Sequence, residues 1–410
     1  MRSALASFSL PGCPERPIAG AVRIGERVFL SGANAQRSGR GLADGDAAAQ
    51  THAVLDELEA ALAAVGGSLA NLTKLTTCIV DRGYRAAVYR AIAERVHNVH
   101  PVSTGLVVAG LATPELIVQI DAEAAIPSAP PRLTRPYTFE SWHGQGFPWQ
   151  GSMVLATDDE FFLRGQTGAR LDHSGIVARG RSASDAGAQA GLAMGNLAEL
   201  LAEAGASLDE VCKITVYISD RAYRPAVYPM IGRTLAGVRP VSTGIVTTAF
   251  AREDILFEID VTIMRKRNGV PHGRVRPYHS SLARYGTQQQ PLDCEFCMAV
   301  VAGDRVILRG QTGMDLNETL VGAGDAKAQA EQAMTNVETL LAESGSSLAD
   351  VVKATVFVTD RAYLGDVTDA VMRRLDGNAP ALTTLVVKGL ASPELLMEVD
   401  ITAVKGSAAR

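Results

Sequence analysis

Two glutamates and two arginines stand at equivalent places in the second and third parts of the chain. Glu258 and Glu398 each lie two residues before an aspartate. Arg164 and Arg309 each open an Arg-Gly-Gln-Thr-Gly segment. Hydrolysis of a C=N or amide bond needs a positioned water, a carboxylate that takes its proton, and donors for the charge that develops. We expect Arg164 to work with Glu258 and Arg309 with Glu398; the alternative is a pair of buried structural ion pairs.

Hydroxyl side chains supply the expected donors. They occur as two adjacent pairs, Ser242 with Thr243 and Thr383 with Thr384. Both pairs follow a proline and begin segments rich in β-branched residues, which favour strands. The sequence therefore predicts a reactive site at strand ends.

The chain repeats itself three times. Segments that begin at Lys74, Lys213 and Lys353 align without a gap, so the period is about 140 residues. A period of this length corresponds to a whole small domain. We expect three copies of one fold, over residues 1–127, 128–268 and 269–410.

Each copy shows the same order of elements. In the second copy, helical spacing of apolar residues predicts a helix from Ser184 to Ala204, with Ser184 and Asp185 at its N-cap. Helices on one face of a mixed sheet leave its other face in need of a partner, which the next copy can provide. The predicted class is α+β, with a barrel-like core of strands and helices outside. The remaining predicted elements of this copy are strands at 211–219, 241–248 and 256–264 and a helix at 221–235; copies one and three have predicted helices at 47–65, 82–96, 326–344 and 361–375.

Several charged residues recur in all three copies, which favours a scaffold role for them. An Asp-Arg pair precedes the second helix of each copy, and we interpret the aspartate as a helix cap. The lysine that opens each repeated segment is expected to extend from a strand end to solvent, and the alternative is that it lines a cleft. The recurring residues are Asp81-Arg82, Asp220-Arg221, Asp360-Arg361, Lys74, Lys213, Lys353, Asp121, Asp260 and Asp400.

Composition narrows the class of protein. The chain has 410 residues, 47% of them hydrophobic, and a net charge of −5, which argues against a nucleic-acid partner. The sequence shows neither a secretory leader nor a membrane-length apolar run, so we expect a cytoplasmic protein with no membrane partner. Cys294 and Cys297 form a lone CxxC, which we interpret as half-buried strand residues. No histidine spacing indicates a metal site, and we expect neither metal nor cofactor.

The run Val211–Asp220, followed by a helix, a proline and Phe257-Glu-Ile-Asp260, resembles the Rid (YjgF, reactive intermediate deaminase) family. Residues 352–360 and 397–400 repeat the likeness in the third copy. The resemblance implies a chorismate-mutase-like (RidA-like) fold, trimers with clefts between subunits, and hydrolysis of enamines and imines without metal or cofactor. By this resemblance the chain is a fused pseudo-trimer with three unlike clefts.

The chain departs from the family pattern at the substrate-binding arginine. Active members carry it two residues after the proline that begins the penultimate strand, where Ser103, Ser242 and Leu382 stand here. Neither serine nor leucine reproduces a bidentate guanidinium–carboxylate contact. The resemblance therefore does not imply 2-aminoacrylate hydrolysis in the usual manner.

Other family positions show how the site is redistributed. The water-holding glutamate corresponds to Gln119 in copy one and to the two glutamates in the others, so copy one lacks a base. The first-strand serine corresponds to Ser31 in copy one and to Arg164 and Arg309 elsewhere. We expect these arginines to replace the missing cation.

The segment that leads into each copy forms a cleft wall in the family. In the second copy this segment carries Trp142 and Trp149. We expect these tryptophans either to line a cleft or to plug the core beneath a loop.

The predicted function is a cofactor-free hydrolase or deaminase that acts on a small imine, enamine or amide at an interdomain cleft. Two alternatives stay open: a metabolite-binding or regulatory protein without turnover, and a lyase or ring-opening enzyme on the same scaffold. The expected partner is a small-molecule substrate, and an intramolecular pseudo-trimer can exist as a monomer.

Overall fold

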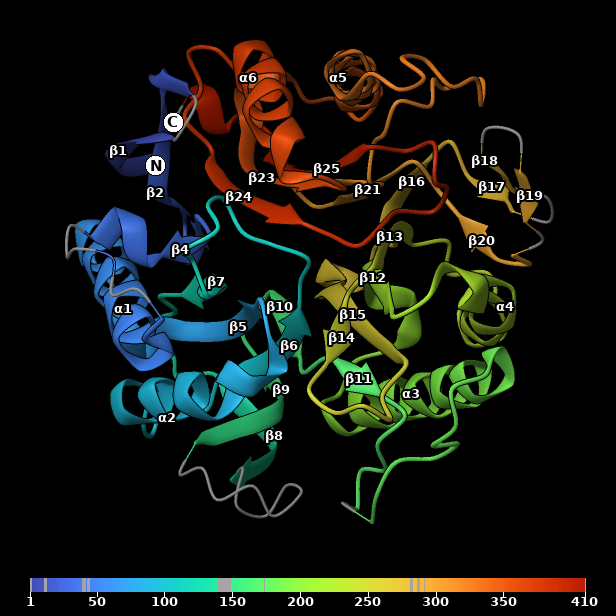
Figure 1. Ribbon diagram of the computed structural model, residues 1–410, viewed down its shortest axis with the longest axis horizontal. Helices are drawn as coiled ribbons and strands as arrows, with labels where there is room; N and C mark the ends of the chain where they lie inside the picture. The colour runs from blue at the N-terminus through green and yellow to red at the C-terminus, as the bar shows by residue number, and fades with distance from the viewer. Residues whose placement is uncertain are drawn as a thin grey trace.

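Three pairs of helices surround an interior of strands in the computed structural model (Figure 1). The structure describes residues 2–10, 13–38, 42, 45–138, 149–172, 174–280, 283–285, 288–290 and 292–409. In the view of Figure 1, α1 and α2 lie at the left, α3 and α4 at the lower right, and α5 and α6 at the top. The predicted α+β class and the arrangement of three similar units are confirmed.

The three copies share the order helix, strand, helix, strand and closing strand, and they differ in the short strands around these elements. The first copy contains β1 (Arg2–Leu10), β2 (Cys13–Ile24), β3 (Arg27–Leu30), β4 (Ala33–Asn34), α1 (Ala47–Ala64), β5 (Leu72–Ile79), α2 (Arg85–Arg95), β6 (Val102–Val107) and β7 (Val118–Ala125). The second contains β8 (Arg132–Thr138), β9 (Gln150–Ala156), β10 (Glu160–Leu163), β11 (Gln166–Thr167), α3 (Ala183–Glu203), β12 (Val211–Ile218), α4 (Arg224–Thr234), β13 (Val241–Val246), β14 (Ala249–Phe250) and β15 (Phe257–Met264). The third contains β16 (Gly273–Val275), β17 (Tyr278–His279), β18 (Ala283–Tyr285), β19 (Gln288–Gln290), β20 (Glu295–Phe296), β21 (Ala299–Ala302), β22 (Arg305–Leu308), α5 (Ala326–Glu343), β23 (Val351–Val358), α6 (Leu364–Arg374), β24 (Ala381–Val386) and β25 (Met397–Val404).

Each copy has a mixed sheet in which one strand, β7, β15 or β25, runs antiparallel to the strands on both sides of it. In the second copy β12 pairs in parallel with β13 and antiparallel with β15, and β15 continues to β10 and β9. The sheets of copies one and three are joined through β2 and β24. The described strands of copy two form a second sheet, except for β14, which pairs with β6 of copy one. The described strands therefore surround the centre of the molecule without closing into one hydrogen-bonded barrel.

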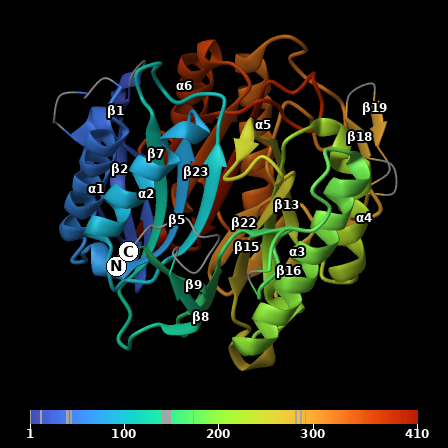
Figure 2. The ribbon, with the colours of Figure 1, turned by 60° about the horizontal axis from the view of Figure 1, so that its bottom comes forward.

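The long helix of each copy packs on the outer side of its sheet. Figure 2 shows α3 and α4 together, outside β13 and β15. Side chains of α3 at helical spacing, including Ala193, Leu197 and Leu200, are fully buried. The N-cap prediction was wrong by two residues: Ser182, not Ser184, caps α3, and Asp185 completes a capping box with it.

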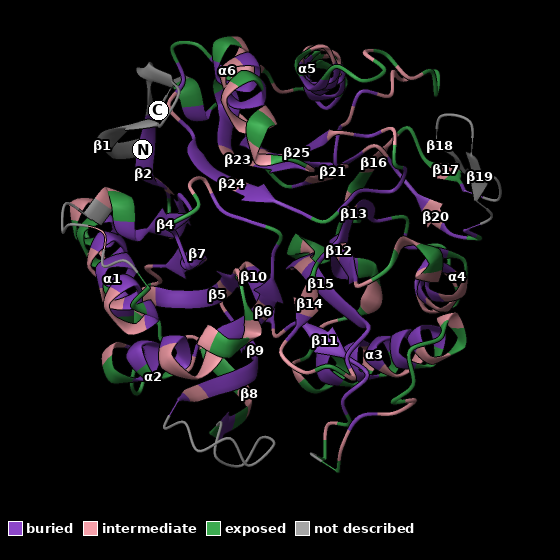
Figure 3. Ribbon diagram, in the orientation of Figure 1, coloured by how far each residue is buried: buried purple, intermediate pink, exposed green. Residues whose placement is uncertain are grey.

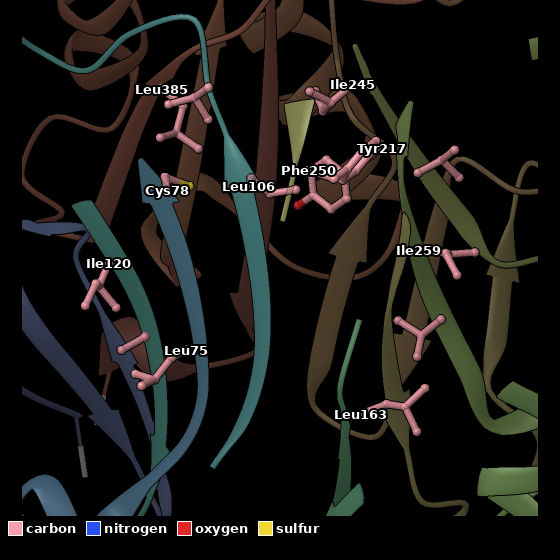
Figure 4. Packing of buried hydrophobic residues seen from close by; sticks show 14 of the residues in the cluster. Leu75, Cys78, Leu106, Ile120, Leu163, Tyr217, Ile245, Phe250, Ile259 and Leu385 are labelled. Carbon is pink, nitrogen blue, oxygen red and sulfur yellow. The ribbon is translucent and has the colours of Figure 1, made fainter. Parts of the chain in front are cut away.

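The core is shared by the three copies. Buried residues concentrate on the strands, and exposed ones on the outer faces of the helices (Figure 3). In the close view of Figure 4, Tyr217 and Phe250 of copy two lie near Leu106 of copy one, with Leu385 of copy three in the same cluster. The strands thus bury their inner faces against one another, as the repeat predicts.

The seams between copies repeat one backbone hydrogen bond. A glycine follows β3, β10 and β22 by two residues. Its N–H donates to a carbonyl of the preceding copy, on the residue two positions after the repeated proline. The three bonds are Gly165 N to Ser103 O (3.3 Å), Gly310 N to Ser242 O (3.3 Å) and Gly32 N to Leu382 O (3.1 Å). Each copy therefore presents the residue before this glycine directly to its neighbour.

Side chains reinforce the same seams. The arginine of each Asp-Arg pair donates from Nε to a carbonyl of the next copy: Arg82 to Phe250 (2.9 Å), Arg221 to Leu390 (2.8 Å) and Arg361 to Leu111 (2.9 Å). The aspartates cap the short helical turns that follow them, as predicted. Scaffold residues recur because all three seams use them.

Candidate functional site

A cavity of about 260 Å³ lies between copies two and three, and we call it the second cleft. Copy three contributes Arg309 and Glu398 to its lining. Copy two contributes Arg224, Tyr228 and Ser242. The arginine and glutamate that the sequence pairs in the third copy therefore face one hollow.

The turn after β22 places Arg309 in the second cleft. The seam hydrogen bond from Gly310 fixes the backbone beside it. The Arg309 guanidinium lies over the ring of Tyr278, 5.7 Å from its centroid. A side chain on Gly310 would collide with the Glu398 carboxylate, so only glycine allows this close approach.

Glu398 projects from β25 and is only 5% exposed. Burial raises the pKa of its carboxyl to about 8, and the Asp400 carboxylate adds to the rise. Arg309, Lys213 and Arg224 oppose it. A carboxyl with a pKa near the working pH can both accept and return a proton.

The first turn of α4 contributes the opposite wall. The Arg224 side chain is 2% exposed, and its Nη1 donates to the Tyr228 hydroxyl at 3.1 Å. Its guanidinium also stacks on the Tyr228 ring, 4.6 Å from the centroid. These two residues were missed by the sequence analysis.

Equivalent residues meet at the seam between copies one and two, and we name this group of side chains the first cleft after its counterpart. Burial raises the pKa of Glu258 to about 8, with Asp260 adding to the rise and Arg164, Lys74 and Arg85 opposing it. The pKa of Arg85 is lowered by burial and by Arg164. These mutual effects show that the side chains share one electrostatic environment.

Aromatic residues line the first cleft. The Arg164 guanidinium lies 5.4 Å from the centroid of the Tyr137 ring. Trp149 is buried and packs on Tyr89 with 5.4 Å between ring centroids, so it serves as a core residue beside the cleft. Trp142 lies outside the described residues.

The seam between copies three and one, the third cleft, holds a residual cavity of about 50 Å³. Leu364 and Thr368 stand where the second cleft has Arg224 and Tyr228. Leu382 also lines this cavity. The wall from copy three has thus lost its cation and its phenol.

The facing wall of the third cleft has changed as well. Ser31 donates from Oγ to Ala19 O at 2.6 Å and accepts from Leu382 N at 2.8 Å. Gln119 donates to Thr384 O at 3.0 Å. Both side chains of copy one therefore form hydrogen bonds to copy three across a seam with a small cavity.

The expected hydroxyl donors divide between two places. Ser242 lines the second cleft, and Ser103 lies at the seam of the first. Thr243 instead donates to Asp400 at 2.5 Å, and Thr383 accepts from Lys353 Nζ at 2.7 Å. Thr384 lies in the third cleft, so three of the four predicted donors are away from the two larger sites.

The recurring lysines do not reach solvent, contrary to the prediction. They line a central cavity of about 170 Å³ and pair with aspartates of the next copy. The distances are 2.8 Å for Lys74–Asp260, 2.5 Å for Lys213–Asp400 and 2.7 Å for Lys353–Asp121. This cavity is charge-paired and separate from the residues of the open clefts.

Cys294 and Cys297 are buried rather than half-buried. Burial raises the pKa of each thiol to about 12, so neither is a thiolate at neutral pH. Among the described residues, no group of three or more His, Cys, Asp or Glu side chains is arranged to hold a metal ion. None of the described helices has the length and apolar character needed to cross a membrane.

A signal for the missed residues was present in the sequence. Arg85 and Arg224 occupy one position of copies one and two, where copy three has Leu364. Arg164 and Arg309 occupy another position of copies two and three. The two patterns are offset by one copy because each cleft takes one wall from each of two successive copies.

Comparison with known proteins finds one family three times along the chain. The family described as Endoribonuclease L-PSP matches residues 14–126, 152–264 and 288–405. The protein DfrA of Myxococcus xanthus is 35% identical over 105 residues, which are 26% of this chain and 79% of DfrA. A 2-iminobutanoate/2-iminopropanoate deaminase of Dermatophagoides farinae is 30% identical over 95 residues, 23% of this chain and 74% of the relative.

A solved structure resembles the chain over most of its length. The crystal structure of a chorismatase has a TM-score of 0.54 and 17% identity, and the match covers 82% of this chain and 93% of the chorismatase. At this identity the likeness concerns the fold. It extends over the three copies together rather than over one.

Proposed function

This chain belongs to the Endoribonuclease L-PSP family, the Rid (YjgF) family of the sequence analysis, and on that basis we propose that it is a hydrolase that releases ammonia from small imine- or enamine-type molecules. The reaction takes place in the first and second clefts. One observation carries the proposal: a buried carboxyl of raised pKa and a guanidinium line the same hollow between successive copies.

The relatives support the class of reaction. Two of the similar proteins, from Dermatophagoides farinae and Rattus norvegicus, are named as deaminases of 2-iminobutanoate and 2-iminopropanoate. These are imines that carry a carboxylate. The same bond type in this chain's substrate needs an anion site and a proton-transferring group.

Arg309 provides the anion site in the second cleft. Its backbone neighbour Gly310 is bonded to the carbonyl of Ser242, the residue that replaces the family's substrate-binding arginine. The guanidinium thus enters from across the seam, close to the position from which the usual cation is missing. Arg164 is placed in the same way beside Ser103 in the first cleft.

Glu398 is the proton-transferring group of the proposed reaction. Its carboxylate takes one proton from water as the water oxygen attacks the carbon of the protonated imine, which leaves a neutral carbinolamine. The same carboxyl then returns that proton to nitrogen. The C–N bond breaks as the carboxylate takes the proton of the new hydroxyl group, and ammonia and a carbonyl compound leave. A pKa of about 8 suits these proton transfers near neutral pH.

The third cleft takes no part in this reaction. Its cavity of about 50 Å³ is too small for a substrate, and Gln119 replaces the glutamate. A glutamine cannot take a proton from water. The proposed enzyme therefore has two working clefts in a ring of three seams.

The family's description names a ribonuclease, but the cleft favours a small molecule. The second cleft encloses about 260 Å³, and the chain has a net charge of −5. Surfaces that bind RNA are usually basic.

Ammonia release from 2-imino acids, generated in situ by an amino-acid oxidase, tests the proposal. We expect the wild-type chain to accelerate release and the Glu258→Gln/Glu398→Gln variant to lose the acceleration. The hydrolase proposal would be refuted if the wild-type chain released ammonia no faster than buffer from every imine and enamine tested. A rise in melting temperature with those compounds but without ammonia would instead support a metabolite-binding protein.

A further inference from the structure

Two guanidinium groups enter the second cleft from different copies. Arg224 comes from the first turn of α4 in copy two, and Arg309 from the turn after β22 in copy three. Glu398 lines the same cavity. A single carboxylate needs only one guanidinium for bidentate recognition.

Of the other charged residues of this lining, Arg276 is paired with Glu343 at 2.6 Å. Asp315 is held by hydrogen bonds from Asn317 N and Thr319 N of its own loop, and Glu318 on that loop is exposed. Arg224 and Arg309 come from opposite walls of the cavity. Two guanidinium groups on opposite walls suit a ligand that carries two separate anionic groups.

Aromatic rings shape the space near the two cations. Phe296 meets Tyr228 edge-on at 6.4 Å between centroids, and Tyr278 lies 6.1 Å from Phe296. All three rings line the cavity. Such walls suit the flat, unsaturated body of a small molecule.

Each cleft has either both arginines or neither. The first cleft has Arg85 and Arg164, and the second has Arg224 and Arg309. The third has neither, because Leu364 and Ser31 stand at these positions. Joint loss from two separate copies is expected if both guanidinium groups hold one ligand.

We propose that the second cleft, and the first by its matching arginines, binds a small molecule with two anionic groups, one held by each arginine, so that the substrate is the imine or enamine of a dicarboxylate. This inference deepens the proposed function, because it assigns a substrate class to the same clefts. Arg85 and Arg224 are then binding residues that a simple 2-imino monocarboxylate would not require.

Calorimetric titration tests the inference without turnover. The probes are malonate, succinate, glutarate and adipate, each compared with the monocarboxylate of equal carbon number, so that the series spans different separations of the two anions. We expect at least one dicarboxylate to bind about tenfold or more tightly than its partner, because a charged hydrogen-bonded contact contributes about 1.5 to 3 kcal/mol. Binding should saturate at two molecules per chain.

The Arg85→Leu/Arg224→Leu variant should lose this preference. Leucine occupies the equivalent position 364 in copy three, so the scaffold accommodates it. The matched control is Arg90→Leu/Arg233→Leu, which removes two exposed arginines from the same helices and should keep the preference. Equal affinity for diacid and monoacid at every length, or a preference that survives Arg85→Leu/Arg224→Leu, would overturn the inference.

The two proposals fail separately. A chain that releases ammonia from 2-imino monocarboxylates but shows no diacid preference keeps the hydrolase and loses the two-arginine site. A chain that prefers diacids but releases no ammonia from any imine keeps the two-arginine site and loses the hydrolase.

Discussion

The carboxyl groups of Glu258 and Glu398 lie in surroundings that disfavour their ionised form. Burial is the main cause, and a second carboxylate two residues along the same strand adds to it. Residues two apart on a strand share a face, so Asp260 and Asp400 necessarily lie on the side of the glutamates. The Glu-x-Asp spacing therefore has an electrostatic consequence of its own.

Replacement of these glutamates should change stability with a characteristic dependence on pH. Their folded pKa values of about 8 exceed the ordinary 4.5, so the wild type loses stability as pH rises between these values. The loss is on the order of 5 kcal/mol per carboxyl at about 1.4 kcal/mol per pH unit. We expect Glu258→Gln/Glu398→Gln to lack this loss and to melt above the wild type at pH 9. Parallel melting curves for both proteins from pH 5 to 9 would contradict the raised pKa values.

The rate of turnover should depend on the ionisation of the same two glutamates. If the carboxylate takes the proton from water, kcat/KM for an imine substrate rises with pH and levels off above about 8. Steady-state rates from pH 6 to 9.5 provide the measurement. A rate that falls through pH 8 would show that the protonated carboxyl is the active form and would exclude the base role.

At the scale of elements, the turns after β10 and β22 position Arg164 and Arg309. The seam hydrogen bond holds the glycine at 165 or 310 against the neighbouring copy. The glutamate side chain fills the space where a β-carbon would lie. Strand, turn and facing carboxyl are thus fitted to one another at atomic contact.

Alanine at both glycines tests this fit. We expect Gly165→Ala/Gly310→Ala to displace Glu258 and Glu398 and to lower turnover by about 100-fold, since a small misplacement of a reacting group is costly. The control is Gly195→Ala within α3, where a β-carbon has open space and should stabilise the helix by about 0.5 to 1 kcal/mol. Unchanged turnover in the double variant, with a native circular dichroism spectrum, would show that the close approach is not needed.

At the scale of the whole molecule, ion pairs order the three copies. Each pair joins a lysine of one copy to an aspartate of the next, so the three form a ring around the central cavity. Buried ion pairs contribute little net stability but penalise a missing partner. Their consistent direction specifies which copy lies beside which.

Removal of one partner should therefore cost more than removal of both charges. We expect Lys213→Met to lower the free energy of unfolding by about 3 to 5 kcal/mol, because Asp400 stays buried without its cation. Lys213→Met/Asp400→Asn should recover most of the loss and keeps an acceptor for the Thr243 hydroxyl. Urea titration of the three proteins measures the coupling, and additive losses would contradict this role.

Internal repetition made most of the architecture predictable. The helices at 183–203, 224–234 and their counterparts lie within a few residues of their predicted bounds, because apolar spacing and capping act over a few residues. The choice of Ser184 as N-cap failed because Ser182, two residues earlier, is equally suited by type and only the chain path selects between them.

The site was predictable only in part. The sequence by itself determined the types of reacting residue, since a turn arginine and a strand glutamate recur in copies two and three. Only the tertiary structure decided which copies share a cleft, and it thereby added Arg85 and Arg224 and moved Thr243 to the central network. The physical reason is that local spacing governs each element, whereas a cleft between copies brings together side chains far apart in the chain.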